Sequence, residues 1–180
     1  MAKFRFGIVG VGSRGIRTFG MQLRARYVER GELVAIADLG ETRLAVAARR
    51  LEVETSYRSA DELIAAPDID VVVITTPDHT HTEIALSAMA PGKHVICEKP
   101  VATTIEGANR LLEASRSFKQ SFLVGFVLRV RAVFRGDAFG DRRLKDWQAS
   151  FRSGGGQPRR GRILQKLAPA AAVLGRAAEP

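Results

Sequence analysis

Cysteine, tryptophan and histidine are scarce in this sequence, which contains one Cys, one Trp and three His in 180 residues. The single cysteine, Cys97, cannot form an internal disulfide, so the fold has to be held by its core. No apolar run reaches the roughly 18 residues that a membrane-spanning helix needs. The N-terminus leads directly into an expected strand, so we expect no secretory signal, a cytoplasmic protein and no membrane partner.

Positive charge is concentrated toward the C-terminus. Residues 1–128 carry 16 Lys and Arg against 15 Asp and Glu, whereas residues 129–180 carry 12 against 4. A basic segment can attract nucleic acid by neutralising phosphates, but this one lacks a zinc pattern and a helix-turn-helix signature. We therefore do not expect nucleic acid as a partner.

Short β-branched runs alternate with segments of helical periodicity along the first 128 residues. The expected strands cover residues 4–9, 33–37, 55–57, 71–74, 94–97 and 122–124. Continuous apolar runs such as residues 71–74 are typical of strands buried on both faces of a parallel sheet. With right-handed crossovers, this alternation predicts an α/β fold with a doubly wound parallel sheet.

Helices are expected between these strands, beginning with residues 13–28 and 42–51. Later helix starts are marked by hydroxyl residues followed three positions on by glutamate, which is the capping-box pattern. These pairs are Ser59 with Glu62, Thr80 with Glu83, and Thr103 with Glu106. In the last of these helices the expected packing face consists of Ile105, Ala108, Leu111, Leu112 and Ser115.

A glycine-rich turn connects the first strand to the first helix. It runs Gly10-Val11-Gly12-Ser13-Arg14-Gly15 and has the pattern G-x-G-x-x-G. Gly10 permits the tight turn, Gly12 lets the backbone approach a diphosphate, and Gly15 lets the helix pack closely on the strand. Its place in the first βαβ unit predicts a dinucleotide site, with Ser13 and Arg14 at the amino end of the helix that faces the phosphates.

An acidic residue, Asp38, ends the second expected strand. A carboxylate at this position can accept hydrogen bonds from both ribose hydroxyls of the adenosine and repels the 2′-phosphate of NADP. NAD is therefore expected ahead of NADP, although the nearby Arg43 leaves NADP open. The alternative is that Asp38 is a solvated turn residue.

Polar residues follow the fourth and fifth expected strands, at the edge where open α/β sheets bind ligands. The first group is Thr75-Thr76-Pro77-Asp78-His79-Thr80-His81, and the second is Glu98-Lys99-Pro100. A His-x-His pair without a Cys or carboxylate cluster does not indicate a metal site. The alternative for the pair is that His79 is exposed and His81 packs at a helix start. Lys99 is a point charge able to polarise a substrate oxygen or hold a ribose, or it is an ordinary surface lysine.

Together, the glycine-rich turn, residues 76–81 and residues 92–100 resemble the N-terminal domain of the glucose-fructose oxidoreductase, inositol dehydrogenase and rhizopine catabolism family. The resemblance covers about residues 4–129 and implies a Rossmann domain that binds NAD, or NADP. It also implies hydride transfer between the nicotinamide and a secondary alcohol of a sugar or cyclitol, with Lys99 as a catalytic or substrate-orienting residue. The cofactor contacts that it implies are Thr75, Thr76, Pro77, His81 and Glu98.

The resemblance ends near residue 129, where Val130, Arg131 and Ala132 replace the family's aromatic residue and proline. We expect a dinucleotide-binding domain over residues 1–128 and a basic tail of low order over residues 129–180. We interpret this tail as a truncated or frame-shifted remnant in place of the family's substrate domain. Two functions stay open, an oxidoreductase by descent and a stand-alone nucleotide-binding module without catalysis. The sequence indicates neither the substrate nor the oligomeric state.

Overall fold

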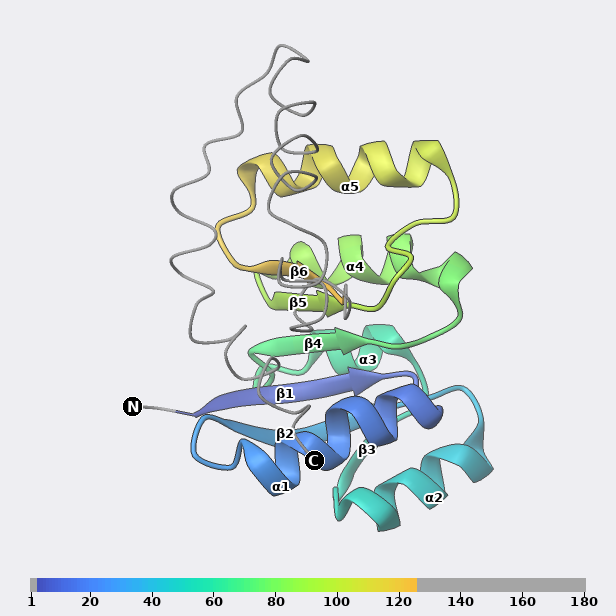
Figure 1. The fold of residues 1–180 in the computed structure, drawn as a ribbon, viewed down its shortest axis with the longest axis vertical. Helices are drawn as coiled ribbons and strands as arrows, with labels where there is room; N and C mark the ends of the chain where they lie inside the picture. Colours follow the sequence, from blue (N-terminus) through green and yellow to red (C-terminus); the bar gives the residue numbers. More distant parts are fainter. Residues whose placement is uncertain (1–2, 126–180) are drawn as a thin grey trace, which may run out of the picture. The chain divides into compact units, whose positions relative to one another are not determined.

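Six parallel strands form one sheet in the order β3-β2-β1-β4-β5-β6 (Figure 1). The computed structural model describes residues 3–125, and the predictions for the basic tail lie outside the described residues. The strands are β1 (Phe4–Val9), β2 (Gly31–Ala37), β3 (Thr55–Tyr57), β4 (Val71–Ile74), β5 (His94–Cys97) and β6 (Phe122–Val124). The chain builds outward from β1 to β3, then crosses back to β4, so the strand order reverses between β1 and β4. The predicted doubly wound parallel sheet is confirmed.

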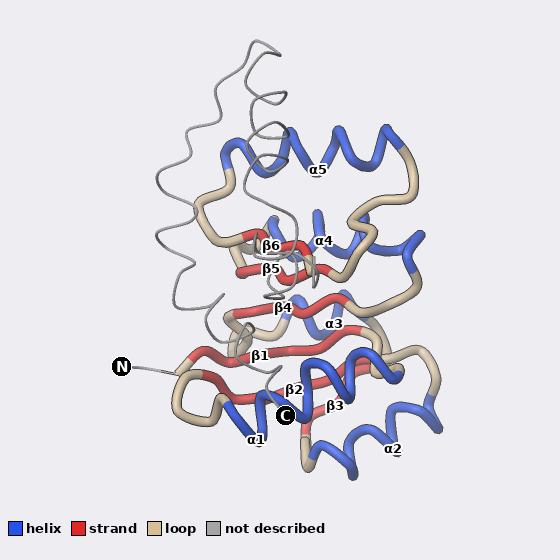
Figure 2. Tube along the Cα trace, in the orientation of Figure 1, coloured by secondary structure: helices blue, strands red, loops and turns tan. Residues whose placement is uncertain are grey.

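Helices cover both faces of this sheet (Figures 1 and 2). The π-helical turn η1 (Gly15–Gly20) continues into α1 (Met21–Arg26), and together with α2 (Glu41–Leu51) it covers one face. The other face carries α3 (Ala60–Ala65), α4 (His81–Met89) and α5 (Ile105–Ser117), with the short 3₁₀ turn η2 (Asp78–Thr80) leading into α4. Within residues 3–125, no helix is long and apolar enough to cross a bilayer.

The strand β4 shows how the sheet divides the core in two. All four of its residues are buried. Because side chains alternate along a strand, Val71 and Val73 face η1, α1 and α2, whereas Val72 and Ile74 face α3, α4 and α5. The main helix residues of the two cores are Phe19, Leu23 and Leu51 on the first face, and Leu63, Met89 and Leu111 on the second.

Two of the three predicted helix starts, those at Ser59 and Thr80, are correct, and the third is shifted by one residue. The Ser59 hydroxyl accepts a hydrogen bond from the backbone N–H of Glu62 at 3.2 Å, as expected of a cap. Helix α4 begins directly after Thr80, as predicted, but η2 gives Thr80 helical backbone angles and its hydroxyl makes no capping bond. That hydroxyl lies 2.7 Å from the carbonyl oxygen of Pro77 instead.

The start and the packing face of α5 are both shifted from the prediction. Thr104, not Thr103, is the cap and accepts a hydrogen bond from the N–H of Gly107 at 3.0 Å. A Cβ atom on Gly107 would lie 2.8 Å from the Thr82 hydroxyl of α4, so close helix packing decides which face of α5 is buried. Of the predicted face, Leu111 is buried, but Ile105 and Leu112 are 83% and 55% exposed.

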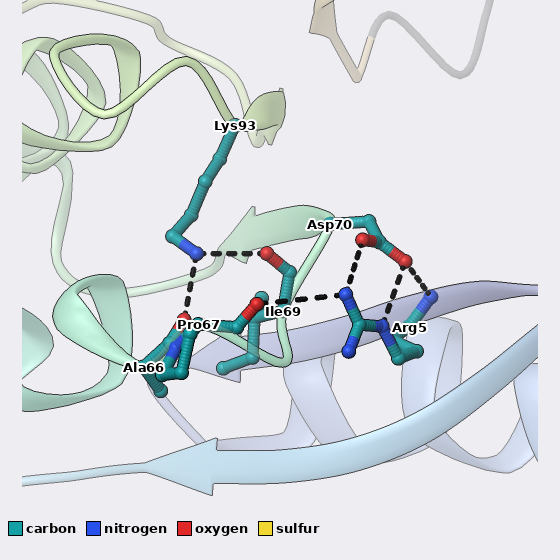
Figure 3. Close-up of polar contacts among 6 residues, drawn as sticks. All are labelled: Arg5, Ala66, Pro67, Ile69, Asp70 and Lys93. Atoms are coloured by element: carbon teal, nitrogen blue, oxygen red, sulfur yellow. Dashed lines mark hydrogen bonds and ion pairs between the residues drawn. The ribbon is translucent and has the colours of Figure 1, made fainter.

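Hydrogen bonds from two charged side chains connect the segments at the amino ends of the strands (Figure 3). The Lys93 ammonium donates to the carbonyl oxygens of Ala66 and Ile69 at 2.7 and 2.8 Å, and so satisfies carbonyls just after α3. Burial lowers the pKa of Lys93. Beside it, the guanidinium of Arg5 donates to both carboxylate oxygens of Asp70, at 3.1 and 2.8 Å. These contacts join the starts of β1, β4 and β5.

Candidate functional site

The loops that follow β1, β2, β4 and β5 lie together at the carboxyl edge of the sheet (Figure 1). The predicted site residues are in these loops: residues 10–15 after β1, Asp38 after β2, residues 75–81 after β4 and residues 98–100 after β5. Parallel strands bring their carboxyl ends to the same edge, so four distant segments of the sequence meet there. The edge lies opposite the Lys93 and Arg5 contacts.

The glycine-rich turn has the backbone geometry that its pattern predicts. Gly10 has a φ of +89°, and a Cβ atom there would lie 2.7 Å from the backbone nitrogen of Thr76. Gly15 is close-packed in the same way, because its Cβ would lie 2.7 Å from the Thr75 hydroxyl. Gly12 differs, because no atom lies within 4 Å of the position its Cβ would take. The turn therefore packs tightly at its two ends and leaves open space at Gly12.

Backbone and hydroxyl hydrogen bonds fix this turn to its neighbours. The N–H of Gly10 donates to the carbonyl of Ala37 at 2.8 Å, which links the turn to the end of β2. On the other side, the N–H of Thr75 donates to Val9 at 2.9 Å and its hydroxyl donates to Gly10 at 2.5 Å. The loops after β1, β2 and β4 are thus parts of one connected surface.

Asp38 is held at this surface by four N–H donors. Its carboxylate accepts from the backbone of Val11 at 2.9 Å and of Gly40 at 2.8 Å. The guanidinium of Arg43 donates to both oxygens, at 3.0 and 2.8 Å. Burial by itself would raise the pKa of Asp38, but the hydrogen bonds from Arg43, Gly40 and Val11 hold it below its usual range. Asp38 is therefore not a freely solvated turn residue: its side chain is 7% exposed.

Glu98 and Arg14 form an ion pair between the loop after β5 and the glycine-rich turn. The distances are 2.8 Å from Arg14 Nε to Glu98 Oε1 and 3.4 Å from Arg14 Nη2 to Glu98 Oε2. The backbone N–H of Lys99 donates to the same Oε2 at 3.1 Å. The Lys99 side chain is exposed, and within residues 3–125 its ammonium has no ion-pair partner.

His81 lies behind the site and joins the loops after β4 and β5. It is 1% exposed, with Nδ1 at 2.7 Å from the carbonyl oxygen of Pro100 and Nε2 at 2.9 Å from that of Thr76. Both ring nitrogens therefore contact the backbone. His79 is exposed. In the sequence only the spacing of the two histidines was visible, and spacing does not show which ring is buried.

The same arrangement of turn, sheet and loops occurs in known proteins. Residues 4–126 match the sequence model of the oxidoreductase family with an NAD-binding Rossmann fold. The chain belongs to this oxidoreductase family. Its members include the inositol dehydrogenases and the rhizopine catabolism protein MocA, so the resemblance seen in the sequence is confirmed.

Three members of the oxidoreductase family illustrate the match. An uncharacterized oxidoreductase of Rhizobium meliloti is 40% identical over 110 residues, which cover 61% of this chain and 32% of that protein. Myo-inositol 2-dehydrogenase of Thermotoga maritima is 30% identical over 131 residues, which cover 73% of this chain and 38% of that protein. The structure of levoglucosan dehydrogenase with NADH and levoglucosan has a TM-score of 0.67 and 32% identity, over 72% of this chain and 36% of that one. The chain thus spans about a third of the length of these family members.

Proposed function

We propose that residues 3–125 are the cofactor domain of an NAD-dependent oxidoreductase that acts on a secondary alcohol of a sugar or cyclitol. One observation carries the proposal: the glycine-rich turn, Asp38, Thr75 and Glu98 meet at one sheet edge and are linked there by hydrogen bonds and an ion pair. Two of the three relatives named above are dehydrogenases of an inositol and of levoglucosan, which supports a polyol or sugar substrate.

The residues present fit a dinucleotide. The open space at Gly12 lies three residues before the first residue of η1, so a diphosphate there would meet backbone amides and the positive end of the helix dipole. Close packing at Gly10 and Gly15 keeps the turn in the required shape. We assign Ser13 to the diphosphate as well. Thr75, Thr76 and Pro77 line the path toward the nicotinamide, and Glu98 has one lone pair left for a ribose hydroxyl.

NAD is the preferred cofactor in this proposal. The Asp38 carboxylate has about four favourable acceptor positions, and these accept four N–H donors. Two of the donors belong to Arg43, whose side chain is 56% exposed and can swing into solvent. The adenosine ribose hydroxyls then take its place, whereas a 2′-phosphate would face the Asp38 charge.

Lys99 is the residue proposed to contact the reacting part of the substrate. The bound cofactor supplies the hydride chemistry, and the protein has to orient the alcohol and manage its proton. The exposed ammonium of Lys99 follows directly on Glu98, so it lies at the nicotinamide end of the proposed cofactor path. From there it can donate a hydrogen bond to the substrate oxygen and stabilise the negative charge that develops as the alcohol proton passes to water. His81, with both nitrogens on the backbone, supports the loop that carries Lys99.

A second function, nucleotide binding without catalysis, is favoured by one specific observation. Within residues 3–125, the carboxylate next to Lys99 in the sequence, that of Glu98, is already engaged by Arg14 and by the Lys99 backbone. No acid in that range forms an ion pair with the Lys99 ammonium that would let the two groups relay a proton. The two functions share the cofactor site and differ in turnover.

Titration of the 180-residue chain with NADH and NADPH tests the cofactor site through nicotinamide fluorescence. Saturable binding that favours NADH is expected. Gly12→Val should abolish binding and leave the thermal unfolding temperature nearly unchanged, because its side chain enters the space of the diphosphate and no protein atom lies within 4 Å of its Cβ. Ala65→Val, an exposed position at the end of α3, is the matched control and should bind normally. Equal binding by Gly12→Val and the control contradicts the site.

Turnover of polyols with NAD distinguishes the two functions. We expect Lys99→Met to lose turnover while its dissociation constant for NADH stays within a factor of about three, because Lys99 acts on substrate. Lys119→Met removes the same charge from an exposed position and is the control. Cofactor binding without turnover of any sugar or cyclitol by the unsubstituted chain favours the binding module.

A further inference from the structure

Glu98 places a buried negative charge at the edge where the proposed cofactor brings two phosphates. Its side chain is 8% exposed. A Cβ atom on Gly125 would lie 3.3 Å from the Glu98 Cδ, so the start of the segment after β6 closes on it from one side. Burial raises the pKa of the neighbouring Cys97 thiol to about 12, and the charge of Glu98 adds to that rise. A buried carboxylate is costly unless it is paired, and unpaired it would also repel the diphosphate.

Arg14 is the cation that pairs with this carboxylate. Arg14 stands inside the glycine-rich turn, 84 residues before Glu98, and its fork spans both carboxylate oxygens. The Arg14 side chain is 43% exposed, so the pair is buried at the acid and open to solvent at the base. The charges of the two groups cancel, so the pair adds no net negative charge to the surface near the turn. Without Arg14 the same surface would carry the Glu98 charge alone.

We infer that Arg14 is a positioning residue for cofactor binding that acts through Glu98, by neutralising and holding the Glu98 carboxylate, and not by binding the phosphates itself. The inference rests on the proposed cofactor function. Two contacts support it. The guanidinium contacts both carboxylate oxygens of Glu98, and the carboxylate so held also accepts the backbone N–H of Lys99. Arg14 thereby links the glycine-rich turn to the loop that carries the proposed catalytic lysine.

A double-mutant cycle tests this route, because it compares the effect of Arg14 with and without the charge of Glu98. Arg14→Ala should weaken NADH binding about tenfold when Glu98 is present. The repulsion between the unpaired Glu98 carboxylate and a nearby phosphate at the protein surface is large enough for a change of that order. In the Glu98→Gln background the same substitution should cost less than about threefold, whatever Glu98→Gln does by itself. Arg14→Lys should recover part of the affinity, because it restores the charge without the fork.

Arg17→Ala is the matched control, because Arg17 is an exposed arginine three residues further along the same helix. It removes an equal charge and should leave NADH affinity unchanged. Thermal unfolding without cofactor identifies any variant that is not folded. If Arg14→Ala does not fold, Arg14→Lys takes its place in the cycle.

Three results would overturn the inference. An equal loss from Arg14→Ala in both backgrounds would make Arg14 a direct cofactor ligand. No loss in the Glu98 background would remove its role altogether. Absence of NADH binding by the unsubstituted chain would overturn the proposed function together with this inference, whereas normal binding there isolates a failure of the inference alone.

Discussion

Thr75 donates its hydroxyl to the carbonyl oxygen of Gly10 across 2.5 Å, and so joins two loops that are 65 residues apart. The same hydroxyl fills the space that a Cβ atom on Gly15 would enter. The shape of the glycine-rich turn therefore depends on a residue of the loop after β4.

Thr75→Val tests this dependence, because valine keeps the shape of threonine and removes the hydroxyl. We expect the free energy of unfolding to fall by about 1–3 kcal/mol, since the carbonyl of the buried Gly10 loses a donor. NADH affinity should fall severalfold as the turn loosens. Urea denaturation and fluorescence titration measure the two effects. Thr42→Val, at an exposed position of α2, is the control. A Thr75→Val protein with unchanged stability and affinity would contradict the role of the hydroxyl.

Asp38 and Arg43 together should set the choice between NADH and NADPH. Asp38→Ser removes the charge that faces a 2′-phosphate and releases Arg43, so the ratio of the two dissociation constants should shift toward NADPH by about tenfold or more. Adding Arg43→Ala should reverse most of that gain, because the released guanidinium is then absent. Titrations of the single and double variants measure the ratios. A double variant that binds NADPH as tightly as Asp38→Ser would show that Arg43 does not contact the phosphate.

Asp70 should make stability depend on pH in the acid range. Hydrogen bonding to Arg5 holds the pKa of Asp70 below its ordinary value, so the folded chain binds fewer protons than the unfolded chain. The stabilisation is complete above the ordinary carboxyl pKa near 4 and is lost as the pH falls through the lower, folded pKa. Asp70→Asn should therefore cost about 1 kcal/mol at pH 7 and progressively less below about pH 4.

Chemical denaturation across this pH range measures that difference. Asp68→Asn, at an exposed neighbouring position, is the control for removing a carboxylate from this part of the surface. A constant difference between Asp70→Asn and the unsubstituted chain from pH 7 to pH 3 would mean that the Arg5 pair does not shift the titration.

The cap of α5 can be assigned by substituting two adjacent threonines. Thr104→Ala should lower the free energy of unfolding by about 1 kcal/mol, because the N–H of Gly107 loses its acceptor. Thr103→Ala is the matched control and should stay within about 0.5 kcal/mol of the unsubstituted chain. Comparison of urea midpoints at equal m-values decides between them, and equal losses would contradict the assignment.

The fold was predictable because its signals are local. The continuous apolar runs of β4 and β5 have the same bounds in the sequence prediction and in the structure. The glycine-rich turn was equally clear, since the tight turn needs a positive φ at position 10 and glycine adopts such a φ without strain. With right-handed crossovers, the alternation of strands and helices then predicted a doubly wound parallel sheet, whereas the order of its strands is seen only in the structure.

The errors concern contacts between distant segments. The apolar pattern of α5 suggested Ile105 and Leu112 as core residues, but the close approach of Gly107 to α4 turns both toward solvent. At the site, Arg14 and Glu98 were each predicted as cofactor contacts, whereas their ion pair had no local signal. For His81 only a position near a helix start could be predicted, and the fold shows that its two ring nitrogens contact carbonyl groups of two loops.

The strand β5 lies in the middle of residues 92–100, which look like one motif in the sequence, and separates the two ends of that motif. Lys93 precedes this strand and holds the end of α3, whereas Glu98 follows it and faces the candidate site. The two residues are about 16 Å apart along the strand, at opposite edges of the sheet. Substitutions at Lys93 should therefore reduce the amount of folded protein in a cell and leave the properties of each surviving molecule intact. Substitutions at Glu98 should change the amount of folded protein less than they change the cofactor binding of each folded molecule. Protein abundance and binding per folded molecule, measured separately, therefore show at which end of β5 a substitution acts.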